Sequence, residues 1–446
     1  MTKSGRCRCL DTQTIKTKVN IMHKYPFQHI KGLNLLTLCG CLLPLAAQGG
    51  FVEDSHLSLE LRNFYMNRDY RDAGLPDTPR HKGQSKAKAE DWGQGFMLRF
   101  ESGFSDGPVG FGLDALGLLG IKLDSGGGTS GTGALARNPR SGEAADEYSF
   151  LGLTGKARIA QTQLTVGTHS PLMPVLIRND TRLLPQTFEG AQLQSKDIEG
   201  LTLTAGQFRQ TRLRDSTDYQ DMSMFADGAT GGVESDRFDF GGIAYAASPQ
   251  LTGTYYYARL EDNYRQHYLG LLHTQPLGES LKLRSELRYF DSDDDGRTTV
   301  DNRNLGAMFT LSYRGHALGA SYQRQTGDTG QPFIAGGADP FVFNTQTYHH
   351  FLRADEDSWQ ARYDYDFAAL GIPGLTLMAR YVRGSDFEIR QRDAHEWERD
   401  VDIAYVIQSG PLRNLSLRWR NVAYRGSRTT DIDENRLIVN YVLKFW

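Results

Sequence analysis

Apolar and polar residues alternate along most of the chain. Leucines at every second position alternate with polar residues over 57–62, and the same period of two recurs over residues 96–101, 375–380, 415–420 and 436–445. This period is that of a β-strand, in which successive side chains point to opposite faces. The alternating segments run for about 10 to 12 residues, the length that a tilted strand needs to cross a bilayer and roughly twice that of an average strand. The pattern therefore predicts a transmembrane sheet, which must close because lipid cannot satisfy the backbone groups of an open edge.

The connections between these segments are of two kinds. Short turns, most of which contain glycine, proline or aspartate, lie at residues 105–108, 158–161, 196–200, 247–251, 275–280, 314–317, 369–374 and 409–414. Longer polar segments lie at residues 69–91, 124–147, 210–236, 291–302, 325–357 and 385–400. About eight short turns, with both termini on the same side, predict an all-β fold: a transmembrane antiparallel β-barrel of about 18 strands with short periplasmic turns and long extracellular loops.

The composition agrees with a sheet whose two faces meet different solvents. Apolar residues make up 39% of the 446 residues and the mean hydropathy is -0.49, which is too polar for a membrane protein built from apolar helices. The net charge of -3 gives no basic excess for binding nucleic acid. All four cysteines precede residue 42, so we expect no disulfide framework and no cysteine-ligated metal in the rest of the chain. No other motif predicts a metal site or a cofactor, and we expect neither.

The N-terminal region has the features of an export signal. A weakly basic stretch precedes the apolar run Leu33–Leu45, and small residues follow it. This is the order of a signal peptide, and the run is short for a membrane-spanning helix. We predict that residues 1–48 form an N-terminal extension and signal peptide, with Met22 as an alternative start, and that residues 49–446 form one outer-membrane barrel domain. The segment Leu38–Cys41 resembles a lipobox, so lipidation is the competing interpretation.

The chain ends on three residues, Lys444, Phe445 and Trp446, directly after an alternating segment. An aromatic residue at this place lies at the periplasmic aromatic girdle of a barrel. It is also the usual form of the signal that the outer-membrane assembly machinery recognises. We therefore predict Trp446 as the assembly signal and that machinery as a partner.

Alternation also predicts which cations face the interior of the barrel. It assigns to the lumen Arg62, Arg68, Arg99, Arg380, Arg418 and Arg420. Because the first and last strands of a closed barrel pair, most of these arginines are expected on one wall. A column of guanidiniums can pass a carboxylate from one to the next through charge-assisted hydrogen bonds. The alternative is that they are solvated lumen charges paired with Glu60 or Glu101.

Several motifs resemble the OprD family of substrate-specific outer-membrane channels. They are Gly50–Ser55, Leu61–Asp69, Trp92–Phe96, Arg182–Thr187, Glu261–Gln266, Ser358–Asp364 and Gly371–Leu375. Together they extend over nearly all of the chain after Gly50. The resemblance implies a monomeric 18-stranded barrel with loops folded into its lumen. It also implies passage of small carboxylate-bearing nutrients, such as amino acids or cyclic and aromatic acids.

The resemblance extends to individual residues. The family has a basic ladder along its lumen, and matching positions are held here by Arg62, Arg380, Arg418 and Arg420. Arg182, within residues 177–188, resembles a residue of the inward-folded constriction loop. Asp339, within residues 336–340, resembles the acidic side of that constriction. Residues 171–175 resemble the subgroup that handles cyclic or aromatic acids.

Three classes of function are open from the sequence. The favoured one is a porin of a Gram-negative outer membrane, in contact with lipid and lipopolysaccharide, for facilitated diffusion of small carboxylates. The second is a barrel enzyme, such as a lipase or protease. His169 and Ser170 are adjacent, and neighbours on a strand face opposite sides, so we expect no enzyme. The third is a plugged structural barrel, which would need apolar or self-paired interior residues.

Overall fold

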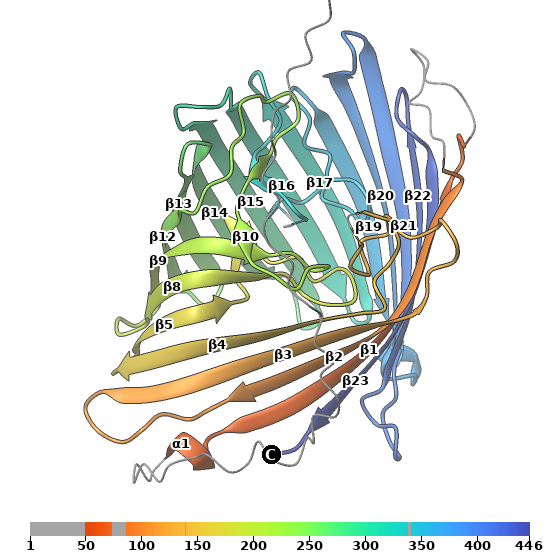
Figure 1. Cartoon of the computed structure of the whole chain (residues 1–446). Helices are drawn as coiled ribbons and strands as arrows, with labels where there is room; N and C mark the ends of the chain where they lie inside the picture. The colour runs from red at the N-terminus through yellow and green to blue at the C-terminus, as the bar shows by residue number, and fades with distance from the viewer. Residues whose placement is uncertain (1–49, 74–85, 139, 338–339) are drawn as a thin grey trace, which may run out of the picture. The chain divides into compact units, whose positions relative to one another are not determined.

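The computed structural model describes residues 50–73, 86–138, 140–337 and 340–446. Within these residues, eighteen long strands form one closed antiparallel barrel, in which each strand pairs with the next along the chain (Figure 1). The ring closes where β23 (Ile432–Lys444) pairs with β1 (His56–Tyr70). The other strands of the ring are β2 (Lys88–Glu101), β3 (Gly110–Asp124), β4 (Glu147–Ile159), β5 (Thr162–His169), β8 (Thr187–Ser195), β9 (Leu201–Arg212), β12 (Phe238–Ser248), β13 (Leu251–Leu260), β14 (Tyr264–Pro276), β15 (Leu281–Asp294), β16 (Asp301–Tyr313), β17 (His316–Thr326), β19 (Asp357–Asp366), β20 (Leu375–Glu388), β21 (Asp393–Val406) and β22 (Ser416–Gly426).

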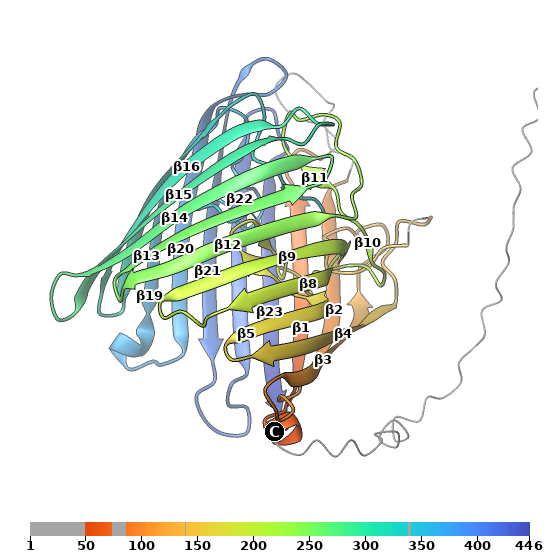
Figure 2. The same cartoon turned by 90° about the vertical axis from the view of Figure 1, so that its left-hand side faces the viewer.

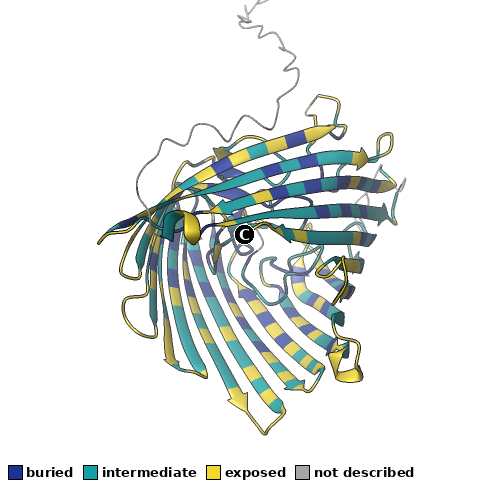
Figure 3. Ribbon diagram, turned by 90° about the horizontal axis from the view of Figure 1, so that it is seen from below, coloured by how far each residue is buried: buried dark blue, intermediate teal, exposed yellow. Residues whose placement is uncertain are grey.

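The predicted alternation is confirmed in the ring, where more buried and more exposed positions alternate along strands such as β16, β17 and β21 (Figure 3). On β22, Leu417 and Trp419 are exposed on the outer face, while Arg418 and Arg420 line a cavity inside the barrel. Neighbouring strands satisfy each other's backbone hydrogen bonds, which is what lets the wall lie in lipid. Among the described residues, no helix has the length and apolar character needed to cross a membrane.

Each predicted short turn joins two neighbouring strands at the rim where the C-terminus lies (Figure 1). The short helix α1 (Gly50–Glu53) precedes β1 at this rim, and the 3-10 helix η1 (Phe367–Leu370) lies in the turn between β19 and β20. This turn ends at Gly371, whose φ of 81° is in the left-handed region that favours glycine. The predicted strand number and the two kinds of connection are thus confirmed.

Two of the predicted long loops were assigned too many residues. β20 continues to Glu388 and β21 begins at Asp393, so a short hairpin replaces the predicted loop at 385–400. The predicted loop at 291–302 shrinks to 295–300. The density of charged residues had indicated loops. Above the apolar band, however, both faces of a barrel wall meet water, so a strand there can be polar on both faces.

Three long loops carry short strands of their own. These strands are β6 (Leu172–Met173) and β7 (Leu176–Ile177) in the β5–β8 loop, β10 (Gln220–Asp221) and β11 (Met224–Phe225) in the β9–β12 loop, and β18 (Phe333–Ile334) in the β17–β19 loop. β11 pairs with β18, so the β9–β12 and β17–β19 loops are joined to each other. In the β5–β8 loop, Leu183 contacts Gly93 and Gly95 on β2.

The main apolar core lies inside the barrel, between these loops and the wall from β8 to β15. Figure 2 shows the strands of this wall side by side. The wall contributes Phe188, Phe208, Phe238, Phe240, Tyr256, Tyr264, Tyr268 and Phe290. The loops contribute Met173, Val175, Leu176, Met222 and Ile334. Burial of these apolar surfaces holds the loops within the lumen. This side of the lumen is therefore filled by packed loops.

The β17–β19 loop is also fixed to the opposite wall through carboxylates on β21. Glu398 accepts hydrogen bonds of 2.9 Å from the backbone nitrogens of Tyr348 and His349. Asp400 accepts a hydrogen bond of 2.8 Å from the Thr347 hydroxyl. Glu398 and Asp400 are fully buried, so these bonds satisfy groups that have lost their contact with water.

Candidate functional site

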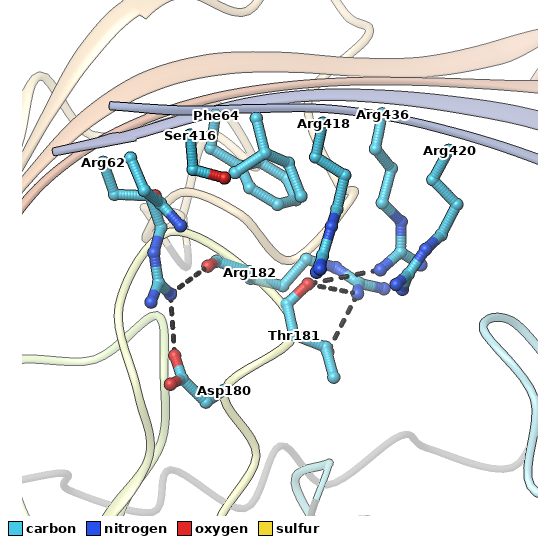
Figure 4. Close-up of a pocket in the computed structure, with 11 residues that line it drawn as sticks. Arg62, Phe64, Asp180, Thr181, Arg182, Ser416, Arg418, Arg420 and Arg436 are labelled. Atoms are coloured by element: carbon cyan, nitrogen blue, oxygen red, sulfur yellow. Dashed lines mark hydrogen bonds and ion pairs between the residues drawn. The ribbon is translucent and has the colours of Figure 1, made fainter. Parts of the chain in front are cut away.

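A cavity of about 370 Å³ lies between the β5–β8 loop and the wall formed by β1, β23 and β22 (Figure 4). The guanidiniums that line it come from Arg62, Arg182, Arg418, Arg420 and Arg436. Strand register explains why they meet. In the strand register, Arg62 on β1 lies opposite Asn440 on β23. Arg420 on β22 lies opposite Arg436, which is also on β23. Four of the five side chains therefore project inward from three neighbouring strands, and Arg182 faces them from the loop.

The β5–β8 loop is attached to this wall by hydrogen bonds. Arg62 donates 2.9 Å to the carbonyl of Arg182, and Arg436 donates 3.2 Å to the carbonyl of Thr181. Arg182 itself donates 3.0 Å from Nε to the carbonyl of Thr132. The first two bonds hold the loop backbone against the wall, and the third joins Arg182 to the β3–β4 loop, in which Thr132 lies.

Arg182 differs from the arginines of the wall. It is only 7% exposed, and it forms no ion pair with any of the residues that the structure describes. Burial lowers the pKa of Arg182 well below its ordinary value, and the nearby guanidiniums of Arg436 and Arg214 lower it further. A cation in this setting is stabilised by any anion that enters the cavity.

The wall arginines are instead paired with carboxylates. Glu60 lies 2.9 Å from both Arg62 and Arg99, and Asp402 lies 2.6 Å from Arg420 and 3.3 Å from Arg418. Pairing limits their net charge. It also fixes the orientation of the guanidiniums, whose remaining N–H groups are available to a solute.

Glu434 on β23 pairs with two further arginines, at 2.7 Å from Arg68 and 2.6 Å from Arg436. A second cavity of about 420 Å³ is lined by Arg68, Arg380 and Arg214, and it shares Arg182, Arg420, Arg436 and Thr181 with the first. The shared residues therefore stand between the two cavities.

The predicted ladder residues are distributed along this path. Arg62, Arg418 and Arg420 line the first cavity, and Arg68, Arg380 and Arg420 line the second. Arg99 lines neither cavity. It lies opposite Ser58 in the register of β1 and β2 and contacts Glu60.

Two further predictions concern residues away from the ladder. Asp339 lies outside the described residues. Trp446 follows the end of β23, and its indole nitrogen donates a 3.1 Å hydrogen bond to the Ser55 hydroxyl.

Known proteins share this architecture. A family model described as outer membrane porin, OprD family, matches residues 49–445. The chain belongs to the OprD family. The porin is 42% identical over 410 residues to the porin-like protein GalP of Pseudomonas putida, across 90% of this chain and 95% of GalP.

Solved structures agree with this assignment. The crystal structure of Pseudomonas aeruginosa OpdQ is 47% identical with a TM-score of 0.80, and covers 90% of this chain and 100% of that one. The crystal structure of Pseudomonas aeruginosa OpdK with vanillate is 38% identical with a TM-score of 0.81, and covers 89% and 100%. The porin is thus a barrel of a Gram-negative outer membrane, and the proteins that it resembles are porins, which are not enzymes.

Two residues of the site were missed in the sequence. Arg436 lies in the alternating segment 436–445, on the same face as Ile438 and Asn440, so the alternation already contained the signal that places it in the lumen. Asp180 pairs with Arg62 at 2.7 Å and lines the first cavity. Its position two residues before Arg182 is the only signal in the sequence.

Proposed function

We propose that this porin mediates facilitated diffusion of small carboxylate-bearing nutrients, either amino acids or cyclic and aromatic acids, along its arginine-lined lumen. The observation that carries the proposal is Arg182, a buried guanidinium without a carboxylate partner among the described residues, which faces four wall arginines across one cavity. A planar carboxylate fits the paired N–H groups of a guanidinium. The volume of about 370 Å³ suits a solute of modest size.

The carboxylates beside the wall arginines support passage rather than capture. An isolated cluster of guanidiniums would hold an anion too tightly for rapid exit, whereas conduction needs several sites of moderate strength. Asp402 and Glu60 each share their charge between two arginines, which weakens the attraction at each step. A solute carboxylate can then exchange between neighbouring guanidiniums.

Asp180 adds an acidic group to the same cavity. With 28% of its side chain exposed, it can accept a hydrogen bond from the ammonium of an amino acid while the solute carboxylate binds Arg182. The relative OpdK, whose crystal structure was determined with vanillate, supports the other part of the proposed range, because vanillate is an aromatic carboxylate. The closed ring of strands supports a channel that works as a monomer.

The proposal is tested by the double variant Arg418→Ala with Arg420→Ala. Uptake of benzoate and of arginine into proteoliposomes is compared with uptake of an uncharged solute of similar size. We expect the carboxylate flux to fall by up to about tenfold, because the pore loses charge-assisted contacts. The flux of the uncharged solute should stay the same or rise, because the pore becomes wider. Arg209→Ala, on the exposed outer face of β9, is the matched control. Unchanged carboxylate flux in the double variant contradicts the proposal.

A further inference from the structure

The outer face of the barrel carries a group of cations and rings that the channel does not use. On β20 and β21, Tyr381 is paired with Arg399, and Arg383 is paired with Trp397. Val382 and Glu398, the neighbours of these residues along the two strands, are fully buried on the inner face. The four side chains therefore face outward, with arginine and aromatic residues alternating both along and across the strands. We call them the outer arginine patch.

Aromatic rings extend the outer arginine patch sideways. The ring centroids of Tyr381 and Trp397 are 5.7 Å apart, and Trp359 on β19 is 5.5 Å from Tyr381. Arg425 on β22 lies over Trp397 at 5.9 Å. Such a row of rings is typical of the level at which a barrel wall passes from hydrocarbon to headgroups.

The outward positions nearer the C-terminal rim fix which membrane interface this is. On β20 they are Leu377 and Ala379, and on β21 they are Val401 and Ile403, all apolar. The hairpin that joins the two strands lies beyond the patch on the opposite side, at the rim of the long loops. The outer arginine patch is therefore at the headgroup level of the extracellular leaflet.

Arg383 and Arg399 form no ion pair or hydrogen bond with any residue in the described part of the chain. The carboxylates on either side are already engaged, because Asp357 lies 3.7 Å from Arg324 and Asp433 lies 2.7 Å from Arg425. The two guanidiniums thus remain available to a ligand from outside the chain.

Outward arginines on other strands differ. Arg303 on β16 lies 3.2 Å from Asp291 and 3.5 Å from Asp293, and Arg237 lies 2.8 Å from Asp239. An outward arginine in this porin can thus have its partner on the barrel itself. The absence of one at Arg383 and Arg399 is a local property of β20 and β21.

We propose that the outer arginine patch binds the phosphorylated headgroup of a lipid of the outer leaflet. Two guanidiniums on a diagonal of neighbouring strands can each donate paired N–H groups to a phosphate, and lysine could not reproduce this geometry. Tyr381 and Trp397 give the sugar or glycerol part of the headgroup flat surfaces to pack on. A second copy of the chain is a poorer occupant, because a symmetric contact would bring unpaired arginines together.

The experiment measures lipid binding to the refolded full-length barrel by native mass spectrometry. The probes are a diphosphorylated lipid A and the same lipid without its phosphates, each titrated into detergent micelles. We expect the phosphorylated lipid to bind, and Arg383→Gln with Arg399→Gln to weaken its binding by about tenfold or more. Arg303→Gln is the matched control, since it removes an outward arginine whose partners are on the barrel, and we expect it to bind as the unmodified protein does.

Three results would overturn the proposal. They are equal binding of the two lipids, unchanged binding in the double variant, and a dimer of the chain whose formation needs Arg383 and Arg399. Single-channel conductance of each variant verifies that the barrel is folded. It also separates this proposal from that of carboxylate passage, because the outer arginine patch lies outside the lumen and its loss should leave conductance unchanged.

Discussion

Arginine is used differently in the lumen and on the outer face of β20 and β21. Inside, Arg68 and Arg436 share the buried Glu434, and Arg418 and Arg420 share Asp402. Outside, on β20 and β21, Arg383 and Arg399 have no partner among the described residues.

The difference follows from the surroundings of the two faces. A guanidinium buried under a loop loses its water and needs a carboxylate nearby. One at the membrane interface keeps water and can meet the phosphates of lipids. Burial under the loops therefore explains why these lumen arginines have carboxylate partners, whereas Arg383 and Arg399 can stay hydrated without one.

The largest effect is expected from Glu434→Ala. Glu434 is fully buried, and its removal leaves Arg68 and Arg436 without their carboxylate, which should lower the free energy of unfolding by about 3 kcal/mol. Asp433→Ala changes the next residue, which faces outward and is 32% exposed, and should cost less than about 1 kcal/mol. Guanidinium chloride unfolding in detergent measures both, and equal losses would remove the distinction between the two faces.

The second effect is on ion selectivity. Arg182→Gln removes a cavity-lining cation that forms no ion pair with any described residue, so we expect the permeability ratio of chloride to potassium to fall by about twofold or more. Reversal potentials across a bilayer with a KCl gradient measure this ratio. Arg99→Gln is the control, since Arg99 lines neither cavity. A ratio that changes equally in both variants would contradict a special role for Arg182.

A pH effect distinguishes a histidine in the lumen from one outside. Burial lowers the pKa of His350 in the β17–β19 loop to about 3, and the charges of His349 and Arg214 contribute. In the unfolded chain this histidine has its ordinary pKa of 6.5. Between pH 6.5 and 3 the unfolded chain therefore binds a proton at this residue, whereas the folded protein does not. The stability that depends on neutral His350 is therefore present above pH 6.5 and is lost progressively as the pH falls toward 3.

His350→Phe should make the stability less dependent on pH between about 6.5 and 4, as measured by unfolding at a series of pH values. The matched control is His395→Phe on the exposed end of β21. A slope that stays the same in His350→Phe would show that other groups control this range.

The smallest effect is expected at the C-terminal rim. Trp446 is 60% exposed and contributes one hydrogen bond to Ser55, so its deletion should change the stability of the finished barrel little. We predict that it slows assembly instead, because we assign the terminal aromatic residue as the assembly signal. The rate at which the heat-modifiable folded form appears measures this. Normal assembly of the truncated chain would contradict the assignment.

The sequence alone determined the wall of the barrel. An alternation such as Leu417, Arg418, Trp419 and Arg420 states which side chains meet lipid and which meet the lumen, because the period of a strand is a local property. The turns are also local, and so the number of strands follows from counting the turns along the chain. The density of charged residues predicted loops that are too long only where both faces of a strand meet water, as at the ends of β20 and β21.

Only the tertiary structure decided what fills the lumen and which charges meet. Arg182 and Asp180 reach the wall because the β5–β8 loop packs on an apolar surface assembled from many strands, and Glu398 holds the β17–β19 loop through backbone nitrogens. Arg383 and Arg399 become neighbours through strand register. These contacts join residues that are distant in the chain or fixed by pairing, so no local pattern contains them.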